Sequence, residues 1–171
     1  GVGVAEIAKA AGLTHGALYA HFKSKDELAA AAFEHGFAGN MVDTQEWAEA
    51  HNPKFEDFLD GLLSTRMRDS LETGCPMAAS ASEIGRQGEA VSTSFARSFE
   101  EQVGWLERSL ERDIPAAEQR RLAIAAVAAE IGAVAVSRAI LKTDATLAND
   151  ILDAVRLALG SAHQAAKARL A

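Results

Sequence analysis

The sequence predicts an all-helical protein, in which a small N-terminal domain is followed by a larger helical domain. Alanine is abundant, whereas the 171 residues include only 3 prolines and 6% aromatic residues. This composition favours helices, because alanine loses the least free energy on entering one. No stretch alternates convincingly between apolar and polar residues at the period of a strand, and apolar residues recur instead at helical spacing.

Charge and cysteine content narrow the class of protein. The chain is 49% apolar and 24% charged, which is ordinary for a folded soluble protein. Its net charge of −7 argues against a protein coated in nucleic acid, but residues 1–28 carry three lysines against three acidic residues and permit a local DNA contact. A single cysteine, Cys75, excludes an intrachain disulfide framework. With no signal peptide visible, we expect a cytoplasmic protein.

Two short helices are predicted near the N-terminus. The first runs from Glu6 to Ala11 and stops at Gly12, a residue that can adopt the left-handed conformation of a turn. Thr14 can cap the second helix, which runs to about His21. The chain starts as if inside a domain, so we expect that a further N-terminal segment precedes it.

A longer helix follows after a second turn. Ser24 is a suitable N-cap, and Glu27 three residues later completes the pattern of a capping box. This helix is expected to extend to about Trp47, although glycines weaken it. Asn52 and Pro53 then predict another start, with a capping side chain followed by proline at the first helical position.

The remainder of the chain reads as further helices separated by glycine and proline. They are expected around Phe55–Leu62 and Met77–Ile84, then at Glu89–Arg112, Leu122–Leu141 and Ala145–Lys167.

The first helices have the organisation of a helix-turn-helix, in which the second helix of the pair enters the DNA major groove. Apolar contacts between the two are expected from Ile7, Leu13 and Leu18, around the small Ala8, and Phe22 is expected to face inward beside Leu18. Gly16, Ala17 and Ala20 then face outward. These small side chains would let the helix backbone lie deep in a groove, where alanine methyls can meet thymine methyls.

Longer polar side chains flank this bare face. His15 and Tyr19 are placed to reach base edges or phosphates, and Lys25 stands at a helix N-terminus where a phosphate can be held. Tyr19 could instead be a packing residue, and Lys25 a solvated one. A metal site from His15 and His21 is disfavoured by their spacing of six residues. Catalysis by Cys75 would need a base partner that the sequence does not indicate.

The stretch AEIAKAAGLTHGALYAHFKSKDEL resembles the DNA-binding region of the tetracycline-repressor (TetR) family, with a strong match over residues 3–28. The resemblance implies a helix-turn-helix domain at residues 1–38, with its first helix truncated, and a helical ligand-binding and dimerisation domain at residues 39–171. Gly3 departs from the threonine that many members have there. The segment GCPMAASASEIG is similar to one branch of these regulators. DNA-contacting positions are implied at Thr14, His15, Gly16, Ala17, Tyr19, His21 and Lys25.

The larger domain gives its own indications of assembly. The stretch LAIAAVAAEIGAVAVSRAIL is too apolar on all sides for a helix with one solvated face. Two such helices from each subunit would form a four-helix, two-fold interface, so we expect a homodimer through the last two long helices. The alternative is that they form the core of a monomer.

Large apolar side chains on three helices could surround a ligand cavity. Few charges fall on the inward stripes, so the expected ligand is an apolar or aromatic small molecule. Ordinary core packing is the alternative for each residue. The candidate ligand-binding residues are Phe58, Leu62, Met67, Met77, Phe95, Phe99 and Trp105.

Together these features predict a ligand-responsive transcriptional repressor, without catalytic residues, cofactor or metal. One alternative is a helical small-molecule-binding or enzymatic protein with a vestigial helix-turn-helix. Another is an activator, or a regulator controlled by a protein partner.

Overall fold

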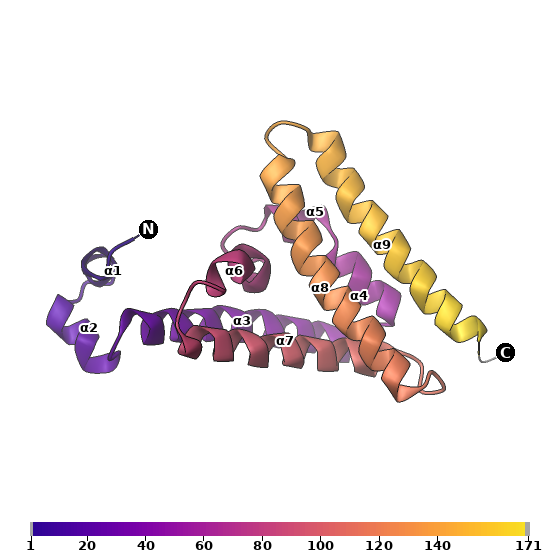
Figure 1. The fold of residues 1–171 in the computed structure, drawn as a ribbon, viewed down its shortest axis with the longest axis horizontal. Helices are drawn as coiled ribbons and strands as arrows, with labels where there is room; N and C mark the ends of the chain where they lie inside the picture. The colour runs from indigo at the N-terminus through magenta and orange to yellow at the C-terminus, as the bar shows by residue number, and fades with distance from the viewer. Residues whose placement is uncertain (1, 170–171) are drawn as a thin grey trace.

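A computed structural model describes residues 2–169, and over this range the chain is helical and contains no strand (Figure 1). The predicted all-helical fold class, a helix-turn-helix head on a helical body, is confirmed. The helices are α1 (Val4–Ala10), α2 (His15–His21), α3 (Lys25–His51), α4 (Phe55–Leu62), α5 (Thr65–Asp69), α6 (Pro76–Ile84), α7 (Glu89–Ser109), α8 (Ala116–Ile140) and α9 (Ala145–Ala168).

The head consists of α1 and α2, which lie at the N-terminal end of α3 (Figure 1). Gly12 takes a φ of +69° in the turn between them, and the backbone N–H of Leu13 donates to the carbonyl of Ala8 at 2.8 Å. Ala8 and Leu18 are the buried side chains of the head. Leu13, which was expected to pack here, is 44% exposed, so that prediction was wrong.

The body is built on α3, whose 27 residues run along α7 (Figure 1). Phe33 and Phe37 of α3 are buried, and the Phe33 ring lies 5.6 Å from the ring of Phe95 on α7. The Ser94 hydroxyl on α7 donates to a carboxylate oxygen of Glu34 at 2.6 Å. Aromatic packing and a part-buried hydrogen bond therefore join the helix that carries the head to the centre of the body.

Two long helices, α8 and α9, pack side by side after a tight turn (Figure 1). The buried Ser137 hydroxyl on α8 donates to the carbonyl of Ala148 on α9 at 2.6 Å. By length and composition α8 could cross a membrane, but it packs against α6, α7 and α9 as a core helix of this fold.

The buried His163 links the C-terminal half of α9 to α4 and to the segment that follows α7. Nδ1 of His163 lies 2.8 Å from Glu56 of α4, and its Nε2 lies 2.6 Å from Glu111, which follows α7. Lys167 also donates to Glu111, at 2.7 Å. Burial alone would raise the pKa of Glu111, but the hydrogen bonds from Lys167 and His163 outweigh it and lower this pKa to about 2.

One predicted helix boundary was wrong because an asparagine can end a helix as well as begin one. Asn52 adopts the left-handed conformation (φ 47°) at the C-terminal cap of α3 and does not start the next helix. Helix α4 begins at Phe55, where the backbone N–H of Lys54 donates to Asp57 at 2.8 Å. The glycines of α3 do not interrupt it, and it continues to His51.

Smaller differences concern helix ends. The helix expected to reach Arg112 ends at Ser109, and the helix expected from Leu122 begins at Ala116, directly after Pro115. Helix α5 was not predicted, because five residues are too few to show a period. Its only local signal is the cap, in which the backbone N–H of Met67 donates to the Ser64 hydroxyl at 3.1 Å.

Candidate nucleic-acid interface and internal chamber

The predicted recognition helix α2 is short and largely solvent-exposed. Its N-cap is Thr14, whose hydroxyl accepts a hydrogen bond from the backbone N–H of Ala17 at 3.1 Å. Ala17 is half-buried, so it faces outward less than expected. The other six implied DNA-contacting residues are exposed: Thr14, His15, Gly16, Tyr19, His21 and Lys25.

One face of α2 combines open space with an aromatic pair. A side chain at Gly16 would meet no atom within 4 Å, which leaves room for another molecule to approach the backbone. Beside it the His15 and Tyr19 rings are 4.9 Å apart, with Tyr19 41% exposed. The pair holds a hydroxyl and an imidazole at the margin of a bare helix surface, a geometry suited to groove contacts.

The start of α3 adds a lysine to this surface. Ser24 caps the helix by accepting from the backbone N–H of Glu27 at 3.1 Å. The expected capping box differs by one residue, since the Glu27 carboxylate accepts from the backbone N–H of Lys23. Lys25 is the first helical residue and is exposed, so its charge lies beside the positive end of the helix dipole.

The neighbouring residue connects the head to the body. The Asp26 carboxylate approaches the backbone of Gly88 so closely that a Cβ at that glycine would overlap it. Gly88 is the N-cap of α7, where the partial positive charge of a helix terminus favours a carboxylate. The start of α3 therefore lies against the start of α7.

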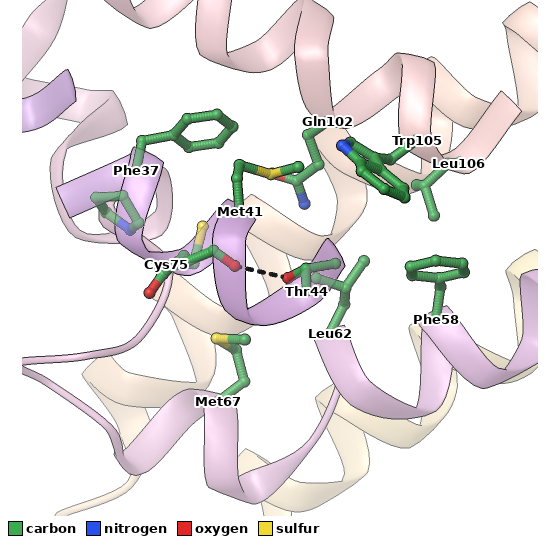
Figure 2. A pocket seen from close by; sticks show the side chains of 12 residues that line it. Phe37, Met41, Thr44, Phe58, Leu62, Met67, Cys75, Gln102, Trp105 and Leu106 are labelled. Carbon is green, nitrogen blue, oxygen red and sulfur yellow. Dashed lines mark hydrogen bonds between the residues drawn. The ribbon is translucent and has the colours of Figure 1, made fainter. Parts of the chain in front are cut away.

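An internal chamber of about 50 Å³ lies in the body between α3, α4, α5 and α7. Figure 2 shows side chains from these helices and Cys75 around one space. Its lining is mainly aromatic and sulfur-containing, with a few polar groups. The lining residues are Phe37, Asn40, Met41, Thr44, Phe58, Leu62, Met67, Cys75, Pro76, Gln102, Trp105 and Leu106.

The structure brings four of the seven candidate ligand-binding residues together around this chamber, namely Phe58, Leu62, Met67 and Trp105. The other three lie elsewhere. Met77 is fully buried in the core, whereas Phe95 and Phe99 are half-buried and pack against it.

Sequence reasoning missed the contribution of α3 to the chamber. That helix had been considered only as the link from the head, yet four of its residues line the chamber: Phe37, Asn40, Met41 and Thr44. Their spacing of three and four residues is a helical stripe that could have identified them.

A buried carboxylic acid, Glu130, lies behind the wall of the chamber. The Cys75 thiol, which caps α6 by accepting from the backbone N–H of Ala78, lies 3.8 Å from Oε2 of Glu130 on α8. Glu130 is 1% exposed, and burial raises its pKa to about 7. Burial, with the nearby Glu130 charge, raises the pKa of Cys75 to about 12. Within residues 2–169, no group of three or more potential ligands is placed to hold a metal ion.

An outer cleft of about 650 Å³ adjoins the chamber and shares five lining residues with it: Asn40, Thr44, Phe58, Leu62 and Met67. The cleft is more polar than the chamber. Three carboxylates line it, from Asp43, Asp57 and Asp60, against one cation from Arg66. Trp47 also lines the cleft and meets the Phe58 ring edge-on at 5.4 Å.

The outer surface of α8 and α9 is unusually apolar. Ile124 and Val136 on α8 are 38% and 48% exposed, and Ala128 and Gly132 between them are exposed at four-residue spacing. On α9, Leu147 is 45% exposed and Leu157 is 68% exposed. Small and apolar residues at such spacing are typical of helices that pack against other helices.

Comparisons with known proteins match both parts of the chain. The family model described as bacterial regulatory proteins, tetR family, matches residues 1–32. The model described as the C-terminal domain of LmrA/YxaF-like transcriptional regulators matches residues 53–148, which is more than half of the chain. A search of the curated proteins found no match.

Proposed function

The chain belongs to the TetR family and is a transcriptional regulator of the kind that binds operator DNA as a homodimer, and from this premise we propose that it is a repressor released from its operator by a small molecule. The proposed division is a DNA-binding domain at residues 1–38 and a ligand-binding and dimerisation domain at residues 39–171. Since DNA in bacteria lies in the cytoplasm, we place the protein there. No catalytic role is proposed, because a buried thiol with a pKa of about 12 is a poor nucleophile.

The observation that carries the DNA-binding proposal is the open face of α2 at Gly16, flanked by the His15–Tyr19 pair. In this proposal His15 reads a base edge at the N-terminal end of the helix, and Tyr19 and Lys25 hold phosphates. Thr14, Gly16, Ala17 and His21 complete the proposed contact surface.

The proposed dimer forms through α8 and α9 of each subunit. The exposed apolar residues on both helices support it, since a single subunit leaves them uncovered. Two-fold packing of these helices would bury them in a four-helix interface. Such a dimer reads two half-sites only when its recognition helices are about 34–36 Å apart, which is one turn of DNA.

The proposed response to ligand depends on the place of the chamber. Its walls come from α3, which carries the head, and from α7, whose N-cap Gly88 lies against Asp26. A ligand that prefers one arrangement of α3 against α7 shifts the dimer toward the corresponding head spacing. DNA affinity then falls in proportion to that preference.

The test begins with selection of bound DNA from a random pool by the full-length protein. A two-fold motif is expected, and His15→Ala should relax the preference at one position in each half-site, at a cost of about 1–3 kcal/mol there. An identical motif selected by the variant would contradict the role of His15. Release of the selected DNA by compounds from a small-molecule library then tests the ligand response.

A further inference from the structure

We propose that the ligand of the internal chamber is a lipophilic cation, an apolar or aromatic body with a protonated amine whose charge is balanced by Glu130. This inference rests on the proposed ligand response and names the chemical class of the ligand. It keeps the expected apolar or aromatic body of the ligand and adds a positive charge to it.

The lining of the chamber, together with the outer cleft that adjoins it, suits the body of such a ligand, because the chamber of about 50 Å³ holds only a part of the ligand and the cleft of about 650 Å³ can take the rest. Phe37, Phe58 and Trp105 present aromatic rings to the space (Figure 2), and the negative face of an aromatic ring attracts a cation. The Trp105 ring already carries the Arg108 guanidinium, 4.6 Å from its centroid, so the attraction falls to Phe37 and Phe58. Met41 and Met67 add flexible, polarisable side chains that adapt to the shape of a guest. Apolar contact alone would also accept a neutral molecule, so the charge preference must come from other residues.

Glu130 is the residue that can supply this charge preference, because one of its carboxylate oxygens has no hydrogen-bond partner. Its Oε2 receives the thiol of Cys75, but its Oε1 is buried and has no hydrogen-bond partner. The nearby cation, Arg138, donates instead to the backbone carbonyls of Met67 and Arg68, at 3.0 and 2.7 Å. A buried carboxylate without a full partner is costly, and a cationic ligand would reduce that cost.

The carboxylate is close enough to act on the chamber. Cys75 and Gln102 line the chamber, and both also interact with Glu130, so the acid lies one side chain behind the wall. Water does not screen a charge well at this depth, so its field extends across that side chain. An ammonium group at the Cys75–Gln102 end of the chamber would therefore be favoured over a neutral group of the same size.

The outer cleft, through which a ligand would enter the chamber, has a net negative charge, as the Glu130 carboxylate does. Asp43, Asp57 and Asp60 line the outer cleft, whereas Arg66 is its one cation. Asp60 also pairs with Arg156 at 2.9 Å, and Asp57 accepts from the Lys54 backbone, so their charges are partly committed. The balance remains negative, which concentrates cations at the cleft and repels anions.

The chain carries its own reporters for the test. Its two tryptophans are Trp47 in the cleft and Trp105 in the chamber, so intrinsic fluorescence senses occupancy of both. The full chain is titrated at about pH 8 with phenylbutylamine, phenylbutanol and phenylbutyrate, which share one aromatic body and differ in charge. The amine should bind at least about tenfold more tightly than the alcohol, and the carboxylate should bind most weakly.

Variants assign the preference to a residue. Glu130→Gln should bring the amine to the affinity of the alcohol and leave the alcohol unchanged. The control is Glu46→Gln, which makes the same change in net charge at an exposed position of α3 and should keep the preference for the amine. If Glu130→Gln fails to fold by circular dichroism, the wild-type titrations still test the charge preference, since equal affinity of amine and alcohol overturns it.

Equal affinity of amine and alcohol in the wild type, or an amine preference that persists in Glu130→Gln, overturns the inference while leaving the chamber a ligand site. If none of the three compounds changes the fluorescence, the chamber itself fails as a ligand site. The inference and the proposed ligand response then fall together, and the DNA-binding proposal stands on its own selection experiment.

Discussion

Replacing Glu130 by glutamine should stabilise the ligand-free protein, which is an unusual expectation for a fully buried position. The wild-type carboxylate is 1% exposed, receives one thiol at 3.8 Å and leaves Oε1 without a partner. Glutamine has nearly the same shape and keeps an oxygen for the Cys75 thiol. It removes the charge, which is the group that burial disfavours most.

The size of the effect follows from the pKa. Burial raises the pKa of Glu130 from 4.5 to about 7, partly opposed by Cys75 and Gln102. A raised carboxyl pKa means that the folded state holds its proton more tightly than the unfolded state. Stability is therefore complete below about pH 4.5 and is lost as pH rises toward 7. At about 1.4 kcal/mol per pKa unit the loss is roughly 3–4 kcal/mol, an upper value because the buried glutamine amide also needs partners.

The assay is urea unfolding of wild type, Glu130→Gln and Glu46→Gln at about pH 5 and about pH 8, at one fixed protein concentration because a dimer's stability depends on it. The gap in unfolding free energy between Glu130→Gln and wild type should be larger at pH 8 by roughly 2–3 kcal/mol. Glu46→Gln should show no such change with pH. A gap that is the same at both pH values would refute the reasoning, as would a Glu130→Gln protein less stable than wild type at pH 8.

Three further predictions concern the head, the dimer and α9. Tyr19→Phe and Lys25→Ala should each weaken binding to all DNA sequences. Lys25→Ala should also reduce the slope of log affinity against log salt concentration by about one unit, as measured by fluorescence anisotropy at several salt concentrations. Unchanged affinity in both variants contradicts the phosphate contacts. Val136 is 48% exposed in one subunit, so Val136→Glu should leave the subunit folded and abolish dimerisation and operator binding. Sedimentation of the wild type at micromolar concentration tests the dimer itself, and a purely monomeric profile rules it out. Because hydrogen bonds from Lys167 and His163 hold the pKa of Glu111 near 2, their contribution to stability is present above about pH 4.5 and lost as pH falls toward 2. His163→Gln should therefore lower the Tm at neutral pH and lessen its fall with acid, and parallel Tm–pH curves for the two proteins would contradict this.

The head could be predicted from sequence because its signals are local. Thr14 caps the helix that follows it, and Gly12 takes the positive φ that the turn requires, so each residue acts on partners within a few positions. Intrinsic preference and capping specify such elements with little help from the rest of the fold. The same reasoning failed at Asn52, where one residue type suits both the end and the start of a helix.

The chamber could not be predicted to the same extent, since its walls depend on which face of each helix turns inward. Phe95 and Phe99 have helical spacing, but Ser94, Ser98 and Gln102 are the more buried residues of that part of α7. The partner surface explains this in part, because Glu34 on α3 offers an acceptor for Ser94. An apolar stripe indicates a buried face only when the opposing helix is also apolar, and the sequence does not say which helix opposes it.

Glu130 shows a different limit of prediction from the sequence. In the sequence it is one acidic residue in a long apolar run, and too few inward charges were counted to predict a charged ligand. The structure places it at 1% exposure behind Cys75, with Oε1 unpartnered. A single acid within a long apolar run is seldom buried without a partner, so the presence of Glu130 in the run is a reason to propose a functional role for it.

The continuity of α3 explains how a guest in the chamber could reach the DNA head. Residues 37–44 of α3 line the chamber, and Lys25 begins the same unbroken helix 12 to 19 residues earlier, a distance of roughly 18–28 Å at the rise of an α-helix. In the proposed response, a small rotation of α3 against α7 at the chamber is transmitted along the helix and changes the orientation of the head. The Asp26–Gly88 contact, at the head end of α7, is where the two helices lie close together. The glycines of α3 are no obstacle, since Gly39 has open space around it and the helix stays continuous through it. In the proposed response, the charge of the ligand, the geometry of the chamber and the spacing of the heads are coupled through these two helices, and the head itself keeps its shape.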